Sequence, residues 1–165
     1  MTYEFTSQLS FGKQGERALD NYYSKQFNIV KATLEEEKAE GFDRLFNPHD
    51  YQSSVRRIEY KTCTWSVKTG NIALEVISND RTGKLGWIHT TKADWIIYYA
   101  YGSGKAYWFR PEDVRAELYE LMKKYRIISA TNKDYHSYNL LVPKDDFIKQ
   151  FVKMTSTDIP EETNE

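Results

Sequence analysis

The most restrictive feature of this 165-residue sequence is a pair of strand-like segments joined by three turn residues. Residues 93–101 and Lys105–Phe109 are rich in aromatic side chains, which favour strands. Between them stands Gly102-Ser103-Gly104, a connection typical of a β-hairpin. The first segment holds the longest apolar run, the seven residues from Trp95 to Tyr101, which is much too short to span a membrane. We therefore expect a sheet, and no membrane partner.

Helix and strand patterns alternate on both sides of this hairpin. Helices are expected over residues 10–27, 111–125 and 144–154. Ser10 is the candidate N-cap of the first helix, and Pro111 stands in the first turn of the second. Strand patterns cover residues 28–34, 41–46, 55–63, 71–78, 126–130 and 137–142. The acidic run 35–40 is interpreted as a solvated turn. Together these elements predict one mixed α/β domain.

Composition and charge restrict the kind of protein. Hydrophobic residues make up 40% of the chain and charged residues 28%, as in ordinary globular proteins. The last ten residues, 156–165, hold four acids and no base, so we expect a domain over 1–155 and a disordered acidic tail. Without those four charges the net charge changes from −1 to +3, which leaves nucleic acid open as a partner. The first residues lack the apolar core of a signal peptide, which predicts a cytoplasmic location.

A Glu-x-Lys triplet is the first candidate for chemistry. In this composition about two acid-x-Lys triplets are expected by chance, and two occur, one beginning at Glu36 and one at Glu59. The first lies in the acidic run, where nothing alternates. The second lies in a strand pattern that puts Arg57, Glu59 and Lys61 on one face and apolar residues on the other. Context therefore favours the triplet from Glu59 to Lys61.

Asp43 stands sixteen residues before Glu59, in a strand pattern of its own. If the two segments pair as a hairpin, the two carboxylates meet across the strands. Carboxylates at that range repel each other unless a divalent cation joins them, and oxygen ligands favour Mg²⁺ or Mn²⁺. The Lys61 ammonium can then orient a water molecule or a phosphate oxygen. Such an arrangement suits phosphodiester hydrolysis.

An aspartate followed by Glu-x-Lys resembles the signature of the PD-(D/E)XK nuclease superfamily, which has the restriction-endonuclease-like fold. Three more segments are similar to small phage-type nucleases, including junction-resolving enzymes, and these are Gly12–Glu16, Thr69–Glu75 and Thr90–Asp94. The similarity covers roughly residues 10–100, and the C-terminal third matches no motif. One departure is Phe42, which stands where the family's pattern has a proline.

The resemblance implies a mixed central sheet flanked by helices and a Mg²⁺-dependent deoxyribonuclease, with Mn²⁺ as a substitute, that leaves 5′-phosphate and 3′-hydroxyl ends. Asp43, Glu59 and Lys61 would be the catalytic residues. The metal ligands would be Asp43, Glu59, the carbonyl of Tyr60 and the helical Glu16. The small size of the domain favours structure- or end-directed cleavage over recognition of a long sequence.

Other residues near the motif are candidates for supporting roles. Glu75 is a candidate for a second metal site, or it simply faces solvent. The candidate DNA contacts are Arg57, Lys68, Lys84 and Lys92. DNA is the expected partner, and a homodimer is compatible with cutting both strands. Exposed aromatic residues can stack on unpaired bases, although packing in the core is their commoner role.

Other interpretations stay open. Glu59 and Lys61 can also form an ordinary surface ion pair, and Glu16 can be a first-turn acid of its helix. The negative net charge agrees with a non-catalytic DNA- or protein-binding module that keeps the nuclease fold. The presence of Asp43 together with Glu59 and Lys61 argues against that module. A protein that mimics DNA with its acidic stretches is a third interpretation.

Overall fold

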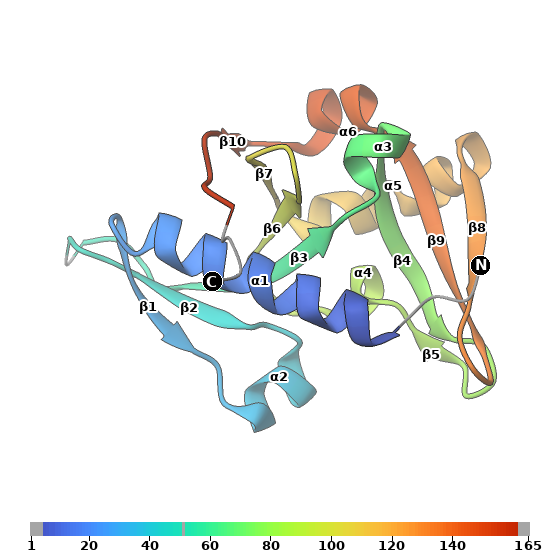
Figure 1. Ribbon diagram of the computed structural model, residues 1–165, viewed down its shortest axis with the longest axis horizontal. Coiled ribbons are helices and arrows are strands. Elements are labelled where there is room, and N and C mark those ends of the chain that lie inside the picture. The colour runs from blue at the N-terminus through green and yellow to red at the C-terminus, as the bar shows by residue number, and fades with distance from the viewer. Residues whose placement is uncertain (1–4, 51, 162–165) are drawn as a thin grey trace.

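The computed structural model describes residues 5–50 and 52–161, which form a mixed α/β structure with two sheets (Figure 1). The larger sheet has the strand order β1-β2-β3-β6-β7-β10. Its strands are β1 (Phe27–Lys31), β2 (Arg44–Pro48), β3 (Arg56–Cys63), β6 (Trp95–Ala100), β7 (Lys105–Phe109) and β10 (Met154–Ser156). The sheet is mixed, because β3 and β6 run parallel whereas the other neighbouring pairs are antiparallel. The expected mixed α/β class is confirmed.

The smaller sheet is antiparallel and has the strand order β5-β4-β9-β8. Its strands are β4 (Asn71–Asn79), β5 (Lys84–Leu85), β8 (Arg126–Thr131) and β9 (His136–Pro143). Ile72, Leu74 and Val76 of β4 are all buried, as their alternation predicts. The strands expected around residues 71–78, 126–130 and 137–142 are therefore confirmed, with small shifts at their ends.

Six helices lie within the described residues. They are α1 (Phe5–Tyr23), α2 (Leu34–Glu40), α3 (Ser66–Thr69), α4 (Trp87–Thr90), α5 (Pro111–Lys124) and α6 (Lys144–Phe151). α5 begins at the expected proline, and Glu112 and Asp113 in its first turn complement the helix dipole. α1 begins before Ser10, so that this residue lies inside the helix and is not its N-cap.

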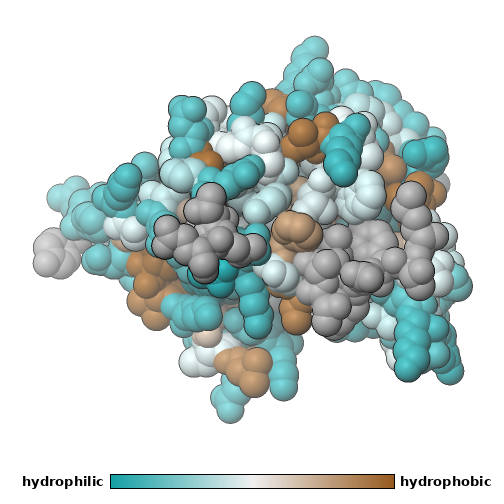
Figure 2. All heavy atoms as spheres, in the orientation of Figure 1, coloured by the Kyte–Doolittle hydropathy of each residue, from teal (hydrophilic) through white to brown (hydrophobic). Residues whose placement is uncertain are grey.

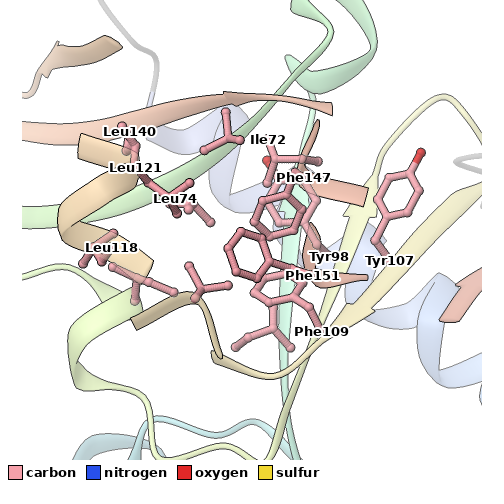
Figure 3. Close-up of a cluster of buried hydrophobic side chains, with 14 of the residues drawn as sticks. Ile72, Leu74, Tyr98, Tyr107, Phe109, Leu118, Leu121, Leu140, Phe147 and Phe151 are labelled. Carbon is pink, nitrogen blue, oxygen red and sulfur yellow. The ribbon is translucent and has the colours of Figure 1, made fainter. Parts of the chain in front are cut away.

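Hydrophobic side chains gather on both faces of the six-stranded sheet. One cluster lies between the two sheets and helices α5 and α6 (Figure 3). It includes Ile72, Leu74, Tyr98, Phe109 and Phe147. The other cluster lies beneath α1, and it includes Leu19, Tyr23, Phe46, Tyr60 and Trp108. Ile96 of β6 belongs to the first cluster and Ile97 to the second, so this strand is buried on both faces, which accounts for its long apolar run.

The acidic run at 35–40 is a helix, so its interpretation as a turn is wrong. At the start of α2, the Thr33 side chain accepts a hydrogen bond from the Glu36 amide at 3.2 Å. In return, the Glu36 carboxylate accepts one from the Thr33 amide at 2.8 Å. This capping box and the acids of the first turn stabilise the helix without a buried face. The apolar spacing that marks most helices is therefore missing here.

The expected boundary between a domain and an acidic tail at residue 156 is also wrong. β10 pairs with β7, and Ser156 lies opposite Ala106. The Tyr23 hydroxyl donates a hydrogen bond to Ser156 Oγ at 2.6 Å, and Ile159 is 3% exposed in the cluster beneath α1. The chain up to this isoleucine is thus part of the domain. Residues 162–165 of the expected tail lie outside the described residues.

On the face shown in Figure 2, hydrophobic residues lie in small groups among hydrophilic ones. Several large side chains, among them Trp108, Tyr98 and Phe46, are fully buried. None of the helices in the described part of the chain is long and apolar enough to cross a membrane.

Candidate active site

Asp43 lies directly before β2 and against the middle of β3. The two strands pair antiparallel with Arg44 opposite Ile58, and the Asp43 amide donates a hydrogen bond to the Ile58 carbonyl at 2.8 Å. The Asp43 carboxylate extends this pairing, because its Oδ2 accepts a hydrogen bond from the Tyr60 amide at 2.8 Å. The structure therefore brings Asp43 next to Glu59 across two antiparallel strands.

The Tyr60 carbonyl faces the same edge of β3 as Asp43. In an extended strand the amide and the carbonyl of one residue point to the same side. The Tyr60 amide points to the Asp43 carboxylate, so the Tyr60 carbonyl is directed to that side as well. Regular pairing with β2 stops two residues before Tyr60, at Ile58. Two kinds of oxygen, carboxylate and carbonyl, thus converge at the point where β2 begins.

Glu59 and Lys61 project from the face of β3 opposite α1, since Ile58 and Tyr60 pack in the cluster beneath that helix. The Lys61 ammonium lies 2.5 Å from Glu59 Oε1. The other carboxylate oxygen, Glu59 Oε2, is buried and has no hydrogen-bond partner. A buried acceptor without a partner is costly. This oxygen is therefore available to a cation or a donor.

Glu75 reaches the same place from β4, in the other sheet. Its carboxylate accepts a hydrogen bond from the Trp87 amide and acts on Lys61 by its charge. The backbone at Gly86 lies very close to the backbone of Glu75. A Cβ on Gly86 would lie 2.1 Å from the Glu75 carbonyl oxygen, so only glycine allows this contact. The next residue is Trp87, and Lys61 Nζ lies over its ring, 5.4 Å from the ring centre.

The electrostatics of this group show an excess of negative charge. Burial raises the pKa of Asp43 to about 6, with Glu59 adding to the rise and Lys61 opposing it. Burial also raises the pKa of Glu75. For Lys61, burial disfavours the charged form, but the neighbouring carboxylates outweigh burial and raise its pKa. Three carboxylates thus surround one ammonium, and a divalent cation would relieve their repulsion.

Glu16 projects from α1 and is held by Arg44, and its charge adds to the rise in the pKa of Asp43. Arg44 is 2% exposed, and its Nη2 donates a hydrogen bond to Glu16 Oε2 at 3.3 Å. Its Nε donates to Asp20 Oδ1 at 3.0 Å, and its Nη1 donates to the Asp43 carbonyl at 3.0 Å. Asp20 also accepts a hydrogen bond from the Tyr60 hydroxyl at 2.9 Å. Glu16 is therefore an ion-pair partner of Arg44, which in turn fixes the peptide of Asp43.

Gly15 brings α1 close to β3. A Cβ at this position would lie 2.0 Å from Thr62 Oγ1, whereas a Cβ on Gly12 would meet nothing within 4 Å. Of the two glycines in the Gly12–Glu16 segment, only Gly15 is therefore required by packing. Its close contact holds the helix on the strand that carries Glu59 and Lys61.

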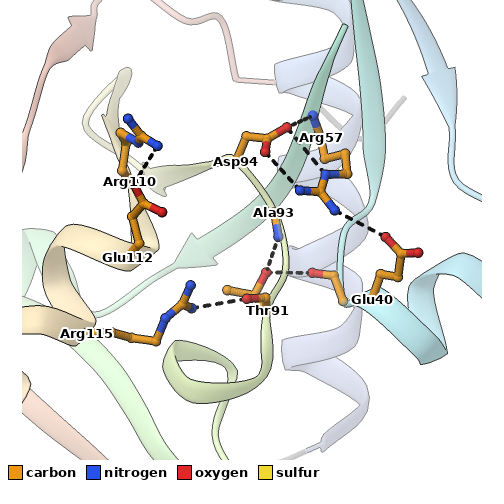
Figure 4. A network of polar contacts seen from close by, with 9 residues as sticks. Glu40, Arg57, Thr91, Ala93, Asp94, Arg110, Glu112 and Arg115 are labelled. Carbon is orange, nitrogen blue, oxygen red and sulfur yellow. Dashed lines mark hydrogen bonds and ion pairs between the residues drawn. The ribbon is translucent and has the colours of Figure 1, made fainter.

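Arg57 is held by acidic residues (Figure 4). Its guanidinium donates to Asp94 Oδ1 at 3.0 Å and to Glu40 Oε2 at 3.3 Å. Asp94 also accepts a hydrogen bond from the Arg57 amide at 2.8 Å. The side chain thus braces β3 against α2 and the start of β6. Lys92 lies nearby with an exposed side chain, and its amide donates to the Glu40 carbonyl at 2.8 Å.

A cleft of about 640 Å³ opens beside Lys61. One wall is the end of β3 with α3, the other wall is formed by β8 and β9, and Glu75 of β4 lines the cleft between them. Lys68 on α3 is exposed, and its Nζ lies 5.3 Å from the centre of the Trp65 ring, which lines the cleft. Lys84 on β5 is exposed and acts by its charge on Glu75. The four expected DNA contacts therefore divide into two pairs, one at this cleft and one beside α2.

Sequence reasoning missed two sets of residues that shape the site. Arg44 shares a strand face with the buried Phe46, and this position was a signal that the arginine needs buried partners. The wall made by β8 and β9 includes Thr131 and Asn139, and no local signal in the sequence connects them with Lys61.

Among the described residues, no group of three or more His, Cys, Asp and Glu side chains is placed to hold a metal ion. The candidate centre therefore consists of the Asp43 and Glu59 carboxylates and the Tyr60 carbonyl. Mg²⁺ is commonly held by one or two carboxylates and completes its shell with water and substrate phosphate. The oxygen donors and the unpartnered Glu59 Oε2 fit such an ion. A cation held by these oxygens would lie beside an ammonium and next to an open cleft.

Comparisons with protein-family models, with curated proteins and with solved structures find no match to this chain.

Proposed function

We propose that this protein is a metal-dependent deoxyribonuclease with the restriction-endonuclease-like fold of the PD-(D/E)XK superfamily. One observation carries the proposal. Asp43 and Glu59 lie side by side on neighbouring strands, Lys61 shares the face of Glu59, and Glu59 Oε2 is buried without a partner. The mixed sheet, in which β3 pairs antiparallel with β2 and parallel with β6, supports the fold.

Asp43, Glu59 and the Tyr60 carbonyl would hold Mg²⁺, with Mn²⁺ as a substitute. The ion supplies neutralisation of phosphate charge and activation of water. Glu16 has a different role in this proposal. It balances the charge of Arg44, whose hydrogen bond to the Asp43 carbonyl keeps the Asp43 side chain against β3.

Lys61 acts as an ammonium. The surrounding carboxylates raise its pKa, which favours the charged form. A fixed positive charge at this place stabilises the negative charge that develops on the phosphate oxygens during hydrolysis. Glu75 faces Lys61 from β4 and orients the ammonium. The expected products carry 5′-phosphate and 3′-hydroxyl ends.

DNA is the proposed partner, with cleavage directed by its structure or its ends. Lys68 and Lys84, near the cleft, are exposed and suited to phosphate contacts. Arg57 is less suited, because Asp94 and Glu40 already balance its charge. Cutting both strands at once would require two copies of the chain.

The test is a cleavage assay on labelled branched, duplex and single-stranded DNA with Mg²⁺, Mn²⁺ or EDTA. Cleavage is expected with either metal and not in EDTA. Lys61→Ala is expected to slow it by roughly 10²- to 10⁴-fold with DNA binding retained. Lys123→Ala, which removes an exposed ion pair on α5, is the matched control and should leave the rate unchanged.

Two results would contradict the proposal. One is an absence of cleavage on every substrate. The other is metal-dependent cleavage that Lys61→Ala leaves intact. An absence of cleavage with DNA binding retained would favour the non-catalytic binding module.

A further inference from the structure

The cleft beside Lys61 has an unusual lining for a surface that meets DNA. Of the described residues that line it, only Lys61 and Glu75 carry a charge. Neutral side chains with donors and acceptors supply much of the rest, and they include Thr64, Thr69, Asn71, Thr131 and Asn139. Such groups match the edges of nucleobases, whereas the two phosphate rows of a duplex require cations.

Two of the four tryptophans line this cleft, and each lies beneath a lysine. Lys61 Nζ lies 5.4 Å from the centre of the Trp87 ring, and Lys68 Nζ lies 5.3 Å from the centre of the Trp65 ring. Trp65 is 38% exposed, although an indole gains from burial. Trp108, in contrast, is 1% exposed in the cluster beneath α1. The cleft therefore combines flat aromatic surface with a positive charge at two places.

We propose that this cleft binds the base of an unpaired nucleotide in single-stranded DNA. This inference rests on the proposed nuclease function for its choice of ligand. The base stacks on Trp65 or Trp87, its polar edge meets neutral side chains such as Asn71 and Asn139, and the flanking phosphates contact Lys61 and Lys68. A phosphate that contacts Lys61 lies beside Glu59, at the candidate centre.

A cleft for an unpaired base should prefer single-stranded DNA to duplex DNA. A base inside a duplex is stacked and paired, and it must be extruded at a cost of a few kcal/mol before it can enter such a cleft. An unpaired base enters without that cost. Single-stranded or frayed DNA is therefore the preferred ligand, and intact duplex binds more weakly.

The test measures binding in EDTA, so that it is independent of cleavage. Fluorescence anisotropy gives the Kd of a labelled twelve-nucleotide oligo(dT) and of a labelled hairpin duplex. We expect the single strand to bind roughly tenfold more tightly than the duplex. Trp65→Ala is expected to raise the Kd of the single strand about tenfold, in line with the loss of one stacked base, and to leave the Kd of the duplex unchanged.

A second variant and two controls guard against a folding defect. Lys68→Ala, at an exposed position, is expected to raise the Kd of the single strand severalfold. Lys123→Ala removes a comparable pair, in which Nζ lies 4.6 Å from the centre of the Tyr119 ring on α5, and should change nothing. Binding should also quench tryptophan fluorescence, and the quenching should shrink in Trp65→Phe and persist in Trp95→Phe.

The outcomes separate this inference from the proposed function. Equal Kd values for single strand and duplex, or a single-strand Kd that both Trp65→Ala and Lys68→Ala leave unchanged, would overturn the base cleft even if the protein cleaves DNA. Single-strand binding that depends on Trp65, in a protein that cleaves no DNA with Mg²⁺ or Mn²⁺, would support the cleft and contradict the nuclease.

Discussion

Asp43 and Arg44 are neighbours in the chain, yet they belong to two charged clusters on opposite sides of β3. In the first cluster, beneath α1, Arg44 is paired with Asp20 and Glu16. Its guanidinium donates from Nε, Nη1 and Nη2 to oxygen atoms. In the described part of the second cluster, the Lys61 ammonium is the one positive charge among three carboxylates, and Glu59 Oε2 is buried without a hydrogen-bond partner.

This difference distinguishes a structural cluster from a candidate binding site. A charged group beneath a helix stabilises a fold only when its hydrogen bonds are completed, as they are around Arg44. The cluster of Asp43, Glu59 and Glu75 leaves repulsion in place, which costs stability unless a ligand relieves it. Groups that are unfavourable in the folded chain alone are characteristic of functional sites. We therefore expect substitutions on the two sides of β3 to change the stability in opposite directions.

The largest expected effect is on the structural side. Arg44→Met should lower the free energy of unfolding by about 3 kcal/mol, because it leaves Asp20 without its buried cation. Arg110→Met, which removes an exposed ion pair with Glu112, is the matched control and should cost less than about 1 kcal/mol. Urea unfolding measures both. An equal, small effect of the two substitutions would remove the distinction between the clusters.

The next effect tests how closely α1 is held on β3. Gly15→Ala should destabilise the protein by about 2 kcal/mol, because the added methyl group collides with Thr62. Gly12→Ala, one turn earlier in the same helix, meets nothing and should stabilise by up to about 1 kcal/mol. Thermal and urea unfolding of both variants measure the contrast. Changes of the same sign would mean that the close contact does not exist.

An effect of similar size and opposite sign is expected on the candidate catalytic side. The pKa of Asp43 is raised from 3.8 to about 6, so the folded state holds its proton more tightly than the unfolded state does. Between pH 4 and pH 6 ionisation of Asp43 therefore lowers the stability of the wild type. Asp43→Asn cannot ionise and still accepts the Tyr60 amide hydrogen bond.

The stability of Asp43→Asn relative to the wild type should therefore rise by about 2 kcal/mol between pH 4 and pH 7, measured by urea unfolding in EDTA. Asp80→Asn is a suitable control, because the pKa of Asp80 is lowered by its hydrogen bonds with His136. Its relative stability should stay nearly constant over the same range, because Asp80 in the folded state is already ionised at pH 4. A difference between Asp43→Asn and the wild type that does not vary with pH would contradict the charge excess.

The predictable parts of this structure depend on local pattern. Alternation in two segments indicates that Asp43 and Glu59 meet, because a strand and its neighbour share one simple geometry. The β6–β7 hairpin is likewise marked by its turn residues. The partner of Arg44 could not be predicted, since Asp20 stands 24 residues earlier on a helix whose docking depends on Gly15.

Two other features depend on tertiary contacts. β10 was missed because the pairing of Ser156 with β7 and the burial of Ile159 are set by distant segments, and an acidic composition gives no sign of them. The cleft wall from β8 and β9 was missed for the same reason, as these strands reach the site through the pairing of β9 with β4. Local pattern thus located the charged groups of the candidate site and left out the cleft beside them.

The most direct test of the central claim, that the Asp43 side of β3 is built for a divalent cation, is Mn²⁺ binding measured by electron paramagnetic resonance at pH 7.5. The wild type should bind Mn²⁺ in competition with Mg²⁺, and Asp43→Asn and Glu59→Gln should each weaken that binding at least tenfold. Glu16→Gln, which removes only a more distant charge that acts on Asp43, should weaken it far less. Wild-type protein that binds no Mn²⁺ at millimolar concentration, or binding that survives both substitutions, would contradict the account.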